Sequence, residues 1–300
     1  MQPDPSFLAG GVPETPFVLQ HAPQPLFATR AARLRFLAQS SELAPYLHFL
    51  ADLCTLQATL AGQLPAPAPV TARRLDEALA AGLPPIDRGA LVDDAQLLAT
   101  LHAVCEQARA LDMPESARQA LDAVRGAEPP MQRGMLAEVL ADQVPADGVA
   151  THLFVALAVQ LHLGRLAAAL PAGRLQPVAT GTCPACGGRP VSSSVIGLRD
   201  IDNVRYACCA GCATQWNEVR IKCLCCGATS GISYRSAGTE DATVKAETCR
   251  ACGSWLKTLY QVRNASLEPV ADDVGSLGLD LLMRDTPFRR AGFNPFLLGY

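Results

Sequence analysis

Cysteine is the residue type whose number and spacing most clearly predict chemistry in this sequence. Twelve cysteines occur in 300 residues, and ten of them lie between positions 183 and 252. Eight of these form four Cys-x-x-Cys pairs, and the last two pairs repeat the first two with a period of 40 residues. In each half of the repeat, 22 residues separate the two pairs, which are Cys183/Cys186 and Cys209/Cys212, then Cys223/Cys226 and Cys249/Cys252.

This pattern predicts two tetracysteine metal sites, one in each half of the repeat. Two cysteines three positions apart in a tight turn can direct both sulfur atoms at one ion, and a second turn brought across by a strand hairpin completes a tetrahedron. A glycine after the second cysteine helps the turn reach a positive φ. Gly187, Gly227 and Gly253 supply this residue. Ala213 follows Cys212 instead, so we expect a slight distortion of that turn.

The predicted sites contain sulfur ligands only, because all five histidines lie upstream of the cysteine region. Four thiolates fit Zn²⁺, a mononuclear iron ion or, less well, an iron–sulfur cluster. The first turn reads Cys-Pro-Ala-Cys-Gly, a sequence of the kind found in rubredoxins, so iron and zinc both stay open. A closed shell of four cysteines leaves no position for a substrate, which favours a structural role over a redox role.

The remaining cysteines are expected to have lesser roles. Cys208 and Cys225 each stand next to a predicted ligand, and we interpret them as inert thiols, with ligand substitution and thiol exchange as the alternatives. Cys54 and Cys105 lie on apolar helical stripes and are expected in the core. A thioredoxin-type redox motif is disfavoured because four pairs in register indicate metal. The sequence shows no phosphate loop, nucleophile elbow or convincing acid–base pair.

A larger folded part must position the cysteine region. Hydrophobic residues make up 49% of the chain and charged residues 18%, which is a globular composition. Abundant Ala and Leu and few aromatic residues favour helices for most of the chain. Apolar residues recur at helical spacing in five segments: 41–61, 71–81, 97–111, 115–125 and 132–140. Glycine, cysteine and short β-branched runs between 181 and 264 predict small antiparallel strands, and 271–283 predicts one more helix.

These patterns predict an α+β chain. A helical N-terminal domain is followed by a tandem pair of rubredoxin-like or zinc-ribbon metal modules, and then by a C-terminal helix with a hydrophobic tail. We expect five segments, which are an irregular N-terminal arm (1–25), the helical domain (26–172), the first tetracysteine module (179–216), the second (217–264), and the C-terminal helix and tail (265–300). We expect the hydrophobic tail near the end, Phe293-Asn294-Pro295-Phe296-Leu297-Leu298, to dock on another surface.

Two aromatic residues and four histidines are expected to be structural. Trp216 and Trp255 follow the second turns of the two modules at nearly matching positions, and we expect each to cover its metal site. Four histidines lie within helical apolar patterns and are interpreted as core residues: His48, His102, His152 and His162.

Charge and hydropathy exclude several classes of protein. The net charge is −3 and the pI is about 6.0, whereas a dedicated nucleic-acid-binding protein usually has a basic excess. The longest apolar stretch, 149–170, contains two histidines, a glutamine and an arginine, so we predict a buried helix and no membrane insertion. No signal-peptide pattern opens the sequence, and we expect a cytoplasmic protein.

The sequence resembles the formate dehydrogenase accessory protein family, FdhE, over nearly its whole length. The resemblance is carried by the run from Cys183 to Ser193, by residues 205–212 with Trp216, and by residues 219–223 and 245–249. The run Ala271-Asp272-Asp273 and the end Asn294-Pro295-Phe296-Leu297 continue it. Arg33-Leu34-Arg35 and residues 46–49 are similar to the helical part of the family but are less specific.

The resemblance implies a cytoplasmic assembly factor and not a metabolic enzyme. Proteins of this family help respiratory molybdenum-dependent formate dehydrogenases become active before export. The likeness therefore implies that the chain binds the catalytic subunit of formate dehydrogenase and holds two metal ions, iron in rubredoxin-type sites, with zinc as the alternative. Two other functions remain as alternatives, a zinc-ribbon nucleic-acid-binding protein and a thiol-redox chaperone that uses Cys208 and Cys225.

Overall fold

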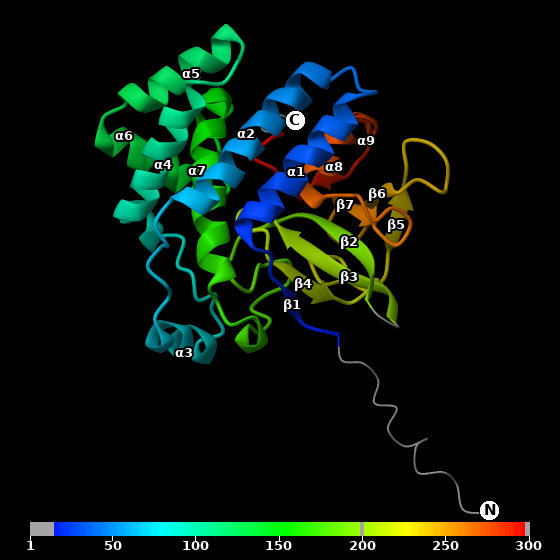
Figure 1. Cartoon of the computed structure of the whole chain (residues 1–300). Helices are drawn as coiled ribbons and strands as arrows, with labels where there is room; N and C mark the ends of the chain where they lie inside the picture. Colours follow the sequence, from blue (N-terminus) through cyan, green and yellow to red (C-terminus); the bar gives the residue numbers. More distant parts are fainter. Residues whose placement is uncertain (1–14, 199–200, 298–300) are drawn as a thin grey trace, which may run out of the picture.

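A computed structural model describes residues 15–198 and 201–297, with helices on one side of the molecule and strands on the other (Figure 1). The helical part contains α1 (Pro23–Ala38), α2 (Ala44–Gln63), α3 (Ala72–Ala80), α4 (Ala95–Ala108), α5 (Glu115–Gly126), α6 (Pro129–Leu140) and α7 (Val149–Ala168). A sheet-rich part with two tetracysteine clusters follows, so the predicted α+β fold class is confirmed.

Helix α7 forms the centre of the helical part. Helices α4, α5 and α6 pack against it, and α1 and α2 contact it as well. The helix is long and apolar enough to cross a membrane, with a hydropathy of 1.4, but 78% of the apolar stretch is buried inside the molecule. Helix α7 is therefore a core helix, as its four interrupting polar residues predicted.

Side-chain caps and prolines explain where several helices begin. Thr71 accepts a hydrogen bond from the N–H of Arg74 at the start of α3, and Asp94 accepts hydrogen bonds from two N–H groups at the start of α4. Helix α1 begins at Pro23. The N–H groups of a first helical turn have no partner within the helix, so proline, which lacks an N–H, is favourable there. This start lies within the segment 1–25 that we expected to be irregular.

The strands form one mixed sheet in the order β1-β4-β3-β2-β7-β6-β5, with β8 beside β7. The strands are β1 (Val18–Leu19), β2 (Pro190–Leu198), β3 (Ile201–Cys209), β4 (Gln215–Glu218), β5 (Ile232–Arg235), β6 (Val244–Cys249), β7 (Ser254–Tyr260) and β8 (Arg289–Arg290). Strands β2, β3 and β4 are antiparallel, as are β5, β6 and β7, which agrees with the sequence prediction.

Strands β2 and β7 join the two halves of the cysteine repeat. They pair in parallel, with Ser193 opposite Thr258 and Ser194 opposite Leu259. This parallel pair was not predicted, because the residues within one strand do not specify a neighbour from a distant part of the chain. The two tetracysteine modules are consequently parts of one sheet.

Helix α8 (Pro269–Gly275) lies between the sheet and the helical part (Figure 1). Asp272 accepts two hydrogen bonds from Arg33 of α1, at 2.9 and 2.7 Å. Glu268, which caps the start of α8, accepts one from Arg30 of α1 at 3.1 Å. All four side chains are buried, so these ion pairs hold α8 in one orientation on α1.

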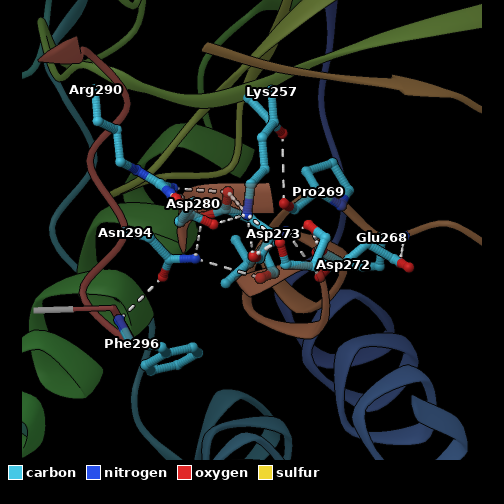
Figure 2. A network of polar contacts seen from close by, with 12 residues as sticks. Lys257, Glu268, Pro269, Asp272, Asp273, Asp280, Arg290, Asn294 and Phe296 are labelled. Atoms are coloured by element: carbon cyan, nitrogen blue, oxygen red, sulfur yellow. Dashed lines mark hydrogen bonds and ion pairs between the residues drawn. The ribbon is translucent and has the colours of Figure 1, made fainter. Parts of the chain in front are cut away.

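The next residue of α8 forms ion pairs with the sheet (Figure 2). Asp273 lies 3.2 Å from Lys257 of β7 and 2.5 Å from Arg290 of β8, and Asp280 contacts the same two cations. Burial acts to raise the pKa of Asp273, but the charges of Lys257 and Arg290 lower it below its usual value. Asn294 donates a hydrogen bond to Asp273 at 2.7 Å and so connects the C-terminal tail to this network.

The C-terminal segment differs from the prediction of a single helix over 271–283. It contains two helices, α8 and α9 (Leu277–Arg284), which are separated at Ser276. The hydroxyl group of Ser276 donates to the carbonyl oxygen of Asp272 at 2.6 Å, a local side-chain bond that competes with helix continuation.

The hydrophobic tail docks on the core of the same chain. Phe296 is 1% exposed, and its carbonyl oxygen accepts a hydrogen bond from the Tyr46 hydroxyl group of α2 at 2.7 Å. Phe296 and Leu297 belong to the main hydrophobic core, so these two side chains are not available to a partner. Leu298 and residues 1–14 of the predicted N-terminal arm lie outside the described residues.

Candidate metal centres

Each Cys-x-x-Cys pair forms the same tight turn. In every turn, the N–H four positions after the first cysteine donates to the carbonyl oxygen of that cysteine, with distances between 2.9 and 3.2 Å. The four donors all have a positive φ: Gly187 (75°), Ala213 (58°), Gly227 (77°) and Gly253 (68°). Ala213 therefore adopts a backbone conformation that glycine favours. The distortion that we expected appears only in its hydrogen bond to Cys209, which at 3.2 Å is the longest of the four.

These turns bring the eight cysteines together in two groups of four. Within each group, all four sulfur atoms lie within 4.8 Å of one another. The first group, cluster 1, consists of Cys183, Cys186, Cys209 and Cys212, and the second, cluster 2, consists of Cys223, Cys226, Cys249 and Cys252.

The spacing of the sulfur atoms fits one tetrahedral ion in each cluster. Neighbouring sulfur atoms are 3.5–3.6 Å apart in cluster 1 and 3.7–3.8 Å apart in cluster 2. A zinc–sulfur bond of about 2.3 Å places the sulfur atoms of a regular tetrahedron about 3.8 Å apart. A donor set of four thiolates suits zinc and iron alike, so either metal could be held there.

Cluster 1 lies at the interface between the sheet and the helical part. Each of its four cysteines is at most 4% exposed and belongs to the main hydrophobic core. The helical part contacts both turns, because the N–H of Ile86 donates to the carbonyl oxygen of Ala185 at 3.1 Å, and Gln160 of α7 donates to that of Ala210 at 2.9 Å. Cluster 1 is therefore held in place by residues on both sides of the interface.

A buried charge set lies beside cluster 1. Arg88 donates to both carboxylate oxygens of Asp142, at 2.7 and 3.2 Å, and the N–H of Arg189 donates to the same carboxylate at 3.1 Å. Burial acts to lower the pKa of Arg88, but the neighbouring Cys186 and Asp142 raise it above its ordinary value. Its guanidinium group thus remains a cation that offsets the negative charge of the sulfur atoms.

Sequence reasoning missed Arg88 and Asp142. The two residues are 54 positions apart and lie in connecting segments of the helical part, outside any motif. Asp142 has a positive φ of 54°, a conformation that aspartate adopts more readily than most residues. No local pattern in the sequence marks either residue as a neighbour of the cysteines.

Cluster 2 lies in a more open setting. Cys223 and Cys249 are buried, but Cys226 is exposed and Cys252 is half-buried. None of the four belongs to the main hydrophobic core of the described residues. Gly181, in the segment after α7, lies against the first turn of cluster 2. A Cβ atom on Gly181 would lie 1.9 Å from the carbonyl oxygen of Leu224 in that turn. Only glycine fits at this approach.

The four other cysteines have different environments. Cys54 and Cys105 are buried in the core, as predicted, and burial raises the pKa of each thiol to about 12. Cys208 is 2% exposed and interacts electrostatically with Glu268 and Arg30, so it faces α1 and α8. Cys225 is exposed. A thiol-exchange partner could therefore reach Cys225 but not Cys208.

The predictions for the aromatic residues and histidines hold in part. Trp216 and Trp255 are both buried, but Trp255 packs in a small cluster with Leu279 and Met283 of α9. His152 and His162 are core residues, as predicted. The prediction was wrong for two others, because the side chains of His48 and His102 lie on exposed helix faces.

Known proteins resemble this chain over almost its full length. Three family models match consecutive segments, described as "FdhE, N-terminal" (residues 15–180), "FdhE, central domain" (182–220) and "FdhE, C-terminal domain" (221–297). A protein of Rhizobium meliloti (strain 1021), named "Protein FdhE homolog", is 52% identical over 302 residues, which cover 100% of this chain and 98% of the relative. A protein of the same name from Pseudomonas putida is 34% identical over 281 residues, covering 91% of this chain and 87% of the relative.

A solved structure has the same fold. The crystal structure of the FdhE protein from Pseudomonas aeruginosa matches with a TM-score of 0.85 and 30% sequence identity. The match covers 95% of this chain and 99% of that protein, so it includes the helical part and the sheet together.

Proposed function

The chain belongs to the FdhE family, and from this premise we propose that it is an accessory factor that helps a respiratory, molybdenum-dependent formate dehydrogenase become active. In this proposal, the chain binds the catalytic subunit of formate dehydrogenase in the cytoplasm, before export, and catalyses no metabolic reaction itself. The observation that carries the proposal is the ordered match to all three FdhE models across residues 15–297.

Two metal ions complete the proposed scaffold. We propose that cluster 1 and cluster 2 each bind one ion through their four thiolates, which the sulfur spacing and the all-sulfur donor set support. Iron is the metal that we propose first, with zinc as the alternative. Iron would supply one-electron chemistry during activation of the partner, whereas zinc has no redox chemistry and would serve the structure alone.

The fold supports binding of a protein partner over catalysis. Cluster 1 is enclosed by core side chains, and a four-cysteine shell leaves no coordination position for a substrate. The long helices and the single sheet hold both clusters in one rigid arrangement, which suits recognition of a folded subunit. The division of the chain into five segments remains a prediction within this proposal.

Purification of the tagged chain from cells that express their own formate dehydrogenase tests the proposal. We expect the catalytic subunit of formate dehydrogenase to copurify, as identified by mass spectrometry of the eluted proteins. We also expect deletion of the gene to abolish formate dehydrogenase activity while the amount of the catalytic polypeptide is maintained. Unchanged activity in the deletion strain would overturn the proposed function.

Metal analysis with electron paramagnetic resonance on anaerobically purified protein tests the choice of metal. High-spin iron at two equivalents per chain is the expected result. A colourless sample with two equivalents of zinc would overturn the iron assignment and would leave the role as a binding scaffold in place.

A further inference from the structure

We propose that cluster 2 is the site at which the chain exchanges its metal ion, that Cys225 assists as an additional ligand, and that cluster 1 retains its ion. This inference deepens the proposed function, since it rests on the binding of metal at both clusters. It assigns different roles to two sites that have identical ligands and identical spacing in the sequence.

The first observation is the difference in exposure between the clusters. An incoming ligand must reach a metal–sulfur bond to displace it, and side chains exclude such a ligand from cluster 1, whose cysteines are 0–4% exposed. In cluster 2, Cys226 is exposed and Cys252 is half-buried. Two of the four metal–sulfur bonds at cluster 2 are therefore open to attack from solvent.

The second observation is the difference in support from the rest of the fold. The turns of cluster 1 are fastened to the helical part through Ile86 and Gln160, and Arg88 lies beside the sulfur atoms as a buried cation. Loss of the ion from cluster 1 would leave four thiolates, which are 0–4% exposed, without the cation that balances their charge, which is costly. The four cysteines of cluster 2 lie outside the main core of the described residues. Leu224 of the first turn belongs to this core, whereas no residue of the second turn, 249–252, does, so the second turn has less support from the rest of the fold.

The third observation is the position of Cys225. Cys225 lies between the ligands Cys223 and Cys226 in the first turn of cluster 2, and its side chain is exposed. Its backbone N–H donates to the sulfur atom of Cys223 at 3.3 Å. A fifth thiol thus belongs to the first turn of cluster 2, directly before the ligand Cys226, and it is exposed.

The exchange step needs no oxidant or reductant. A bond forms between the ion and the sulfur atom of Cys225, whose thiol proton passes to solvent. The bond between the ion and Cys226 breaks, and the released thiolate takes a proton from solvent. The number of sulfur ligands and the total charge would not change in this step, and the freed Cys226 could then bind an incoming metal ion at the surface.

Cys208 provides a matched control within the same chain. It also stands directly before a ligand cysteine, but it is buried, and the groups near it are the Arg30–Glu268 pair together with Cys209 and Cys212. Cluster 1 therefore has no accessible spare thiol among the described residues. Replacement of Cys208 should leave metal exchange unchanged.

Chelator-induced metal release from the full chain tests the proposal. The chain is loaded anaerobically with two equivalents of zinc, and release to 4-(2-pyridylazo)resorcinol is followed by absorbance. We expect two phases of one equivalent each. After the first phase, iodoacetamide should label Cys226 and Cys252 but not Cys186 or Cys212, as read from peptide masses.

Variants then test the role of the fifth thiol. Cys225→Ala should slow the first phase several-fold and leave the second unchanged, whereas Cys208→Ala should alter neither phase. Release of both equivalents at one rate, or labelling of cluster 1 first, would overturn the assignment of cluster 2. An unchanged first phase in Cys225→Ala would overturn the role of Cys225.

Failure of this inference and failure of the proposed function give different results. A chain that binds fewer than two equivalents of zinc would contradict the proposed scaffold, and this inference with it. A chain that binds two equivalents and releases them together would contradict only the inference.

Discussion

Ala213 shows that a Cys-x-x-Cys turn can keep its shape with a residue that its backbone conformation disfavours. Its φ of 58° is positive like those of the three glycines in the equivalent position of the other turns, which are 68–77°. A left-handed conformation costs a non-glycine residue about 1–2 kcal/mol, because its Cβ atom approaches the following carbonyl oxygen. The packing of cluster 1 in the core outweighs this cost.

Ala213→Gly should stabilise the metal-loaded chain. Relief of the left-handed strain exceeds the added flexibility of glycine in the unfolded chain, so we expect the free energy of unfolding to rise by about 0.5–1 kcal/mol. Urea unfolding of the two proteins measures the difference. Ala210→Gly in the same turn is the control, since Ala210 has no positive φ, and it should be neutral or destabilising. A loss of stability in Ala213→Gly would contradict the strain argument.

His162 is a buried residue whose two ring nitrogens form no hydrogen bonds within the described part of the chain. The nearest carboxylate oxygen, of Asp94, is 4.0 Å away. Burial lowers the pKa of His162 below its ordinary value of 6.5. Below about pH 6.5, His162 therefore binds a proton in the unfolded chain but not in the folded chain. The free energy of unfolding consequently falls as the pH falls through this range.

His162→Leu should reduce the dependence of stability on pH. We expect the free energy of unfolding of the original chain to fall more steeply than that of the variant between about pH 6.5 and 5.5. Urea unfolding at both pH values gives the two slopes. Metal release in acid affects both proteins equally, since they share all the cysteines, so their difference isolates His162. Equal slopes would show that His162 does not contribute.

At the scale of elements, α8 connects the helical part to the sheet through ion pairs with both. Consecutive aspartates in this short helix point to different partners, Asp272 to α1 and Asp273 to β7 and β8. Buried ion pairs contribute little net stability, but they penalise strongly any arrangement in which one partner is missing. Helix α8 therefore determines how the sheet is oriented on the helices.

Asp273→Asn should destabilise the chain strongly. The change leaves the buried Lys257 and the partly buried Arg290 with one carboxylate in place of two, and breaking such a buried pair costs about 3–5 kcal/mol. The free energy of unfolding in urea is the measurement. Asp241→Asn is the matched control, because Asp241 is 97% exposed and lies 3.8 Å from Arg263, so we expect almost no change. Similar effects of the two substitutions would refute the role of the buried network.

At the scale of the whole molecule, one hydrophobic core spans the helices and cluster 1. Buried residues of α2, α4 and α7 belong to the same core as the four cysteines of cluster 1 and the C-terminal Phe296. The composition of the sequence indicated separate helical and metal-binding domains. Because the helical part and cluster 1 share this core, we expect the two parts to fold together.

The metal-loaded chain should therefore unfold in a single transition. We expect far-ultraviolet circular dichroism, which reports mainly on the helices, and fluorescence of Trp216 and Trp255, which lie in the sheet, to change at the same urea concentration. Two separate transitions would show that the shared core does not couple the parts.

The sequence by itself determined the features that depend on nearby residues. Two cysteines three positions apart close a turn that involves only their immediate neighbours, so the eight cysteines of the clusters and the repeat of 40 residues could be recognised without a structure. The helical segments followed from their apolar period, and α7 was recognised as a core helix from its polar residues. The family resemblance was also visible in the cysteine turns and the C-terminal Asn294-Pro295-Phe296-Leu297.

Only the tertiary structure decided the features that depend on contacts between distant residues. The parallel pairing of β2 with β7, the charge pair Arg88–Asp142 and the ion pairs of α8 all join positions that share no local pattern. The same reason explains why two sites with identical ligands differ. Burial is a property of the surrounding fold and not of the ligand spacing, so the sequence predicted two equal clusters where the structure has one enclosed and one open.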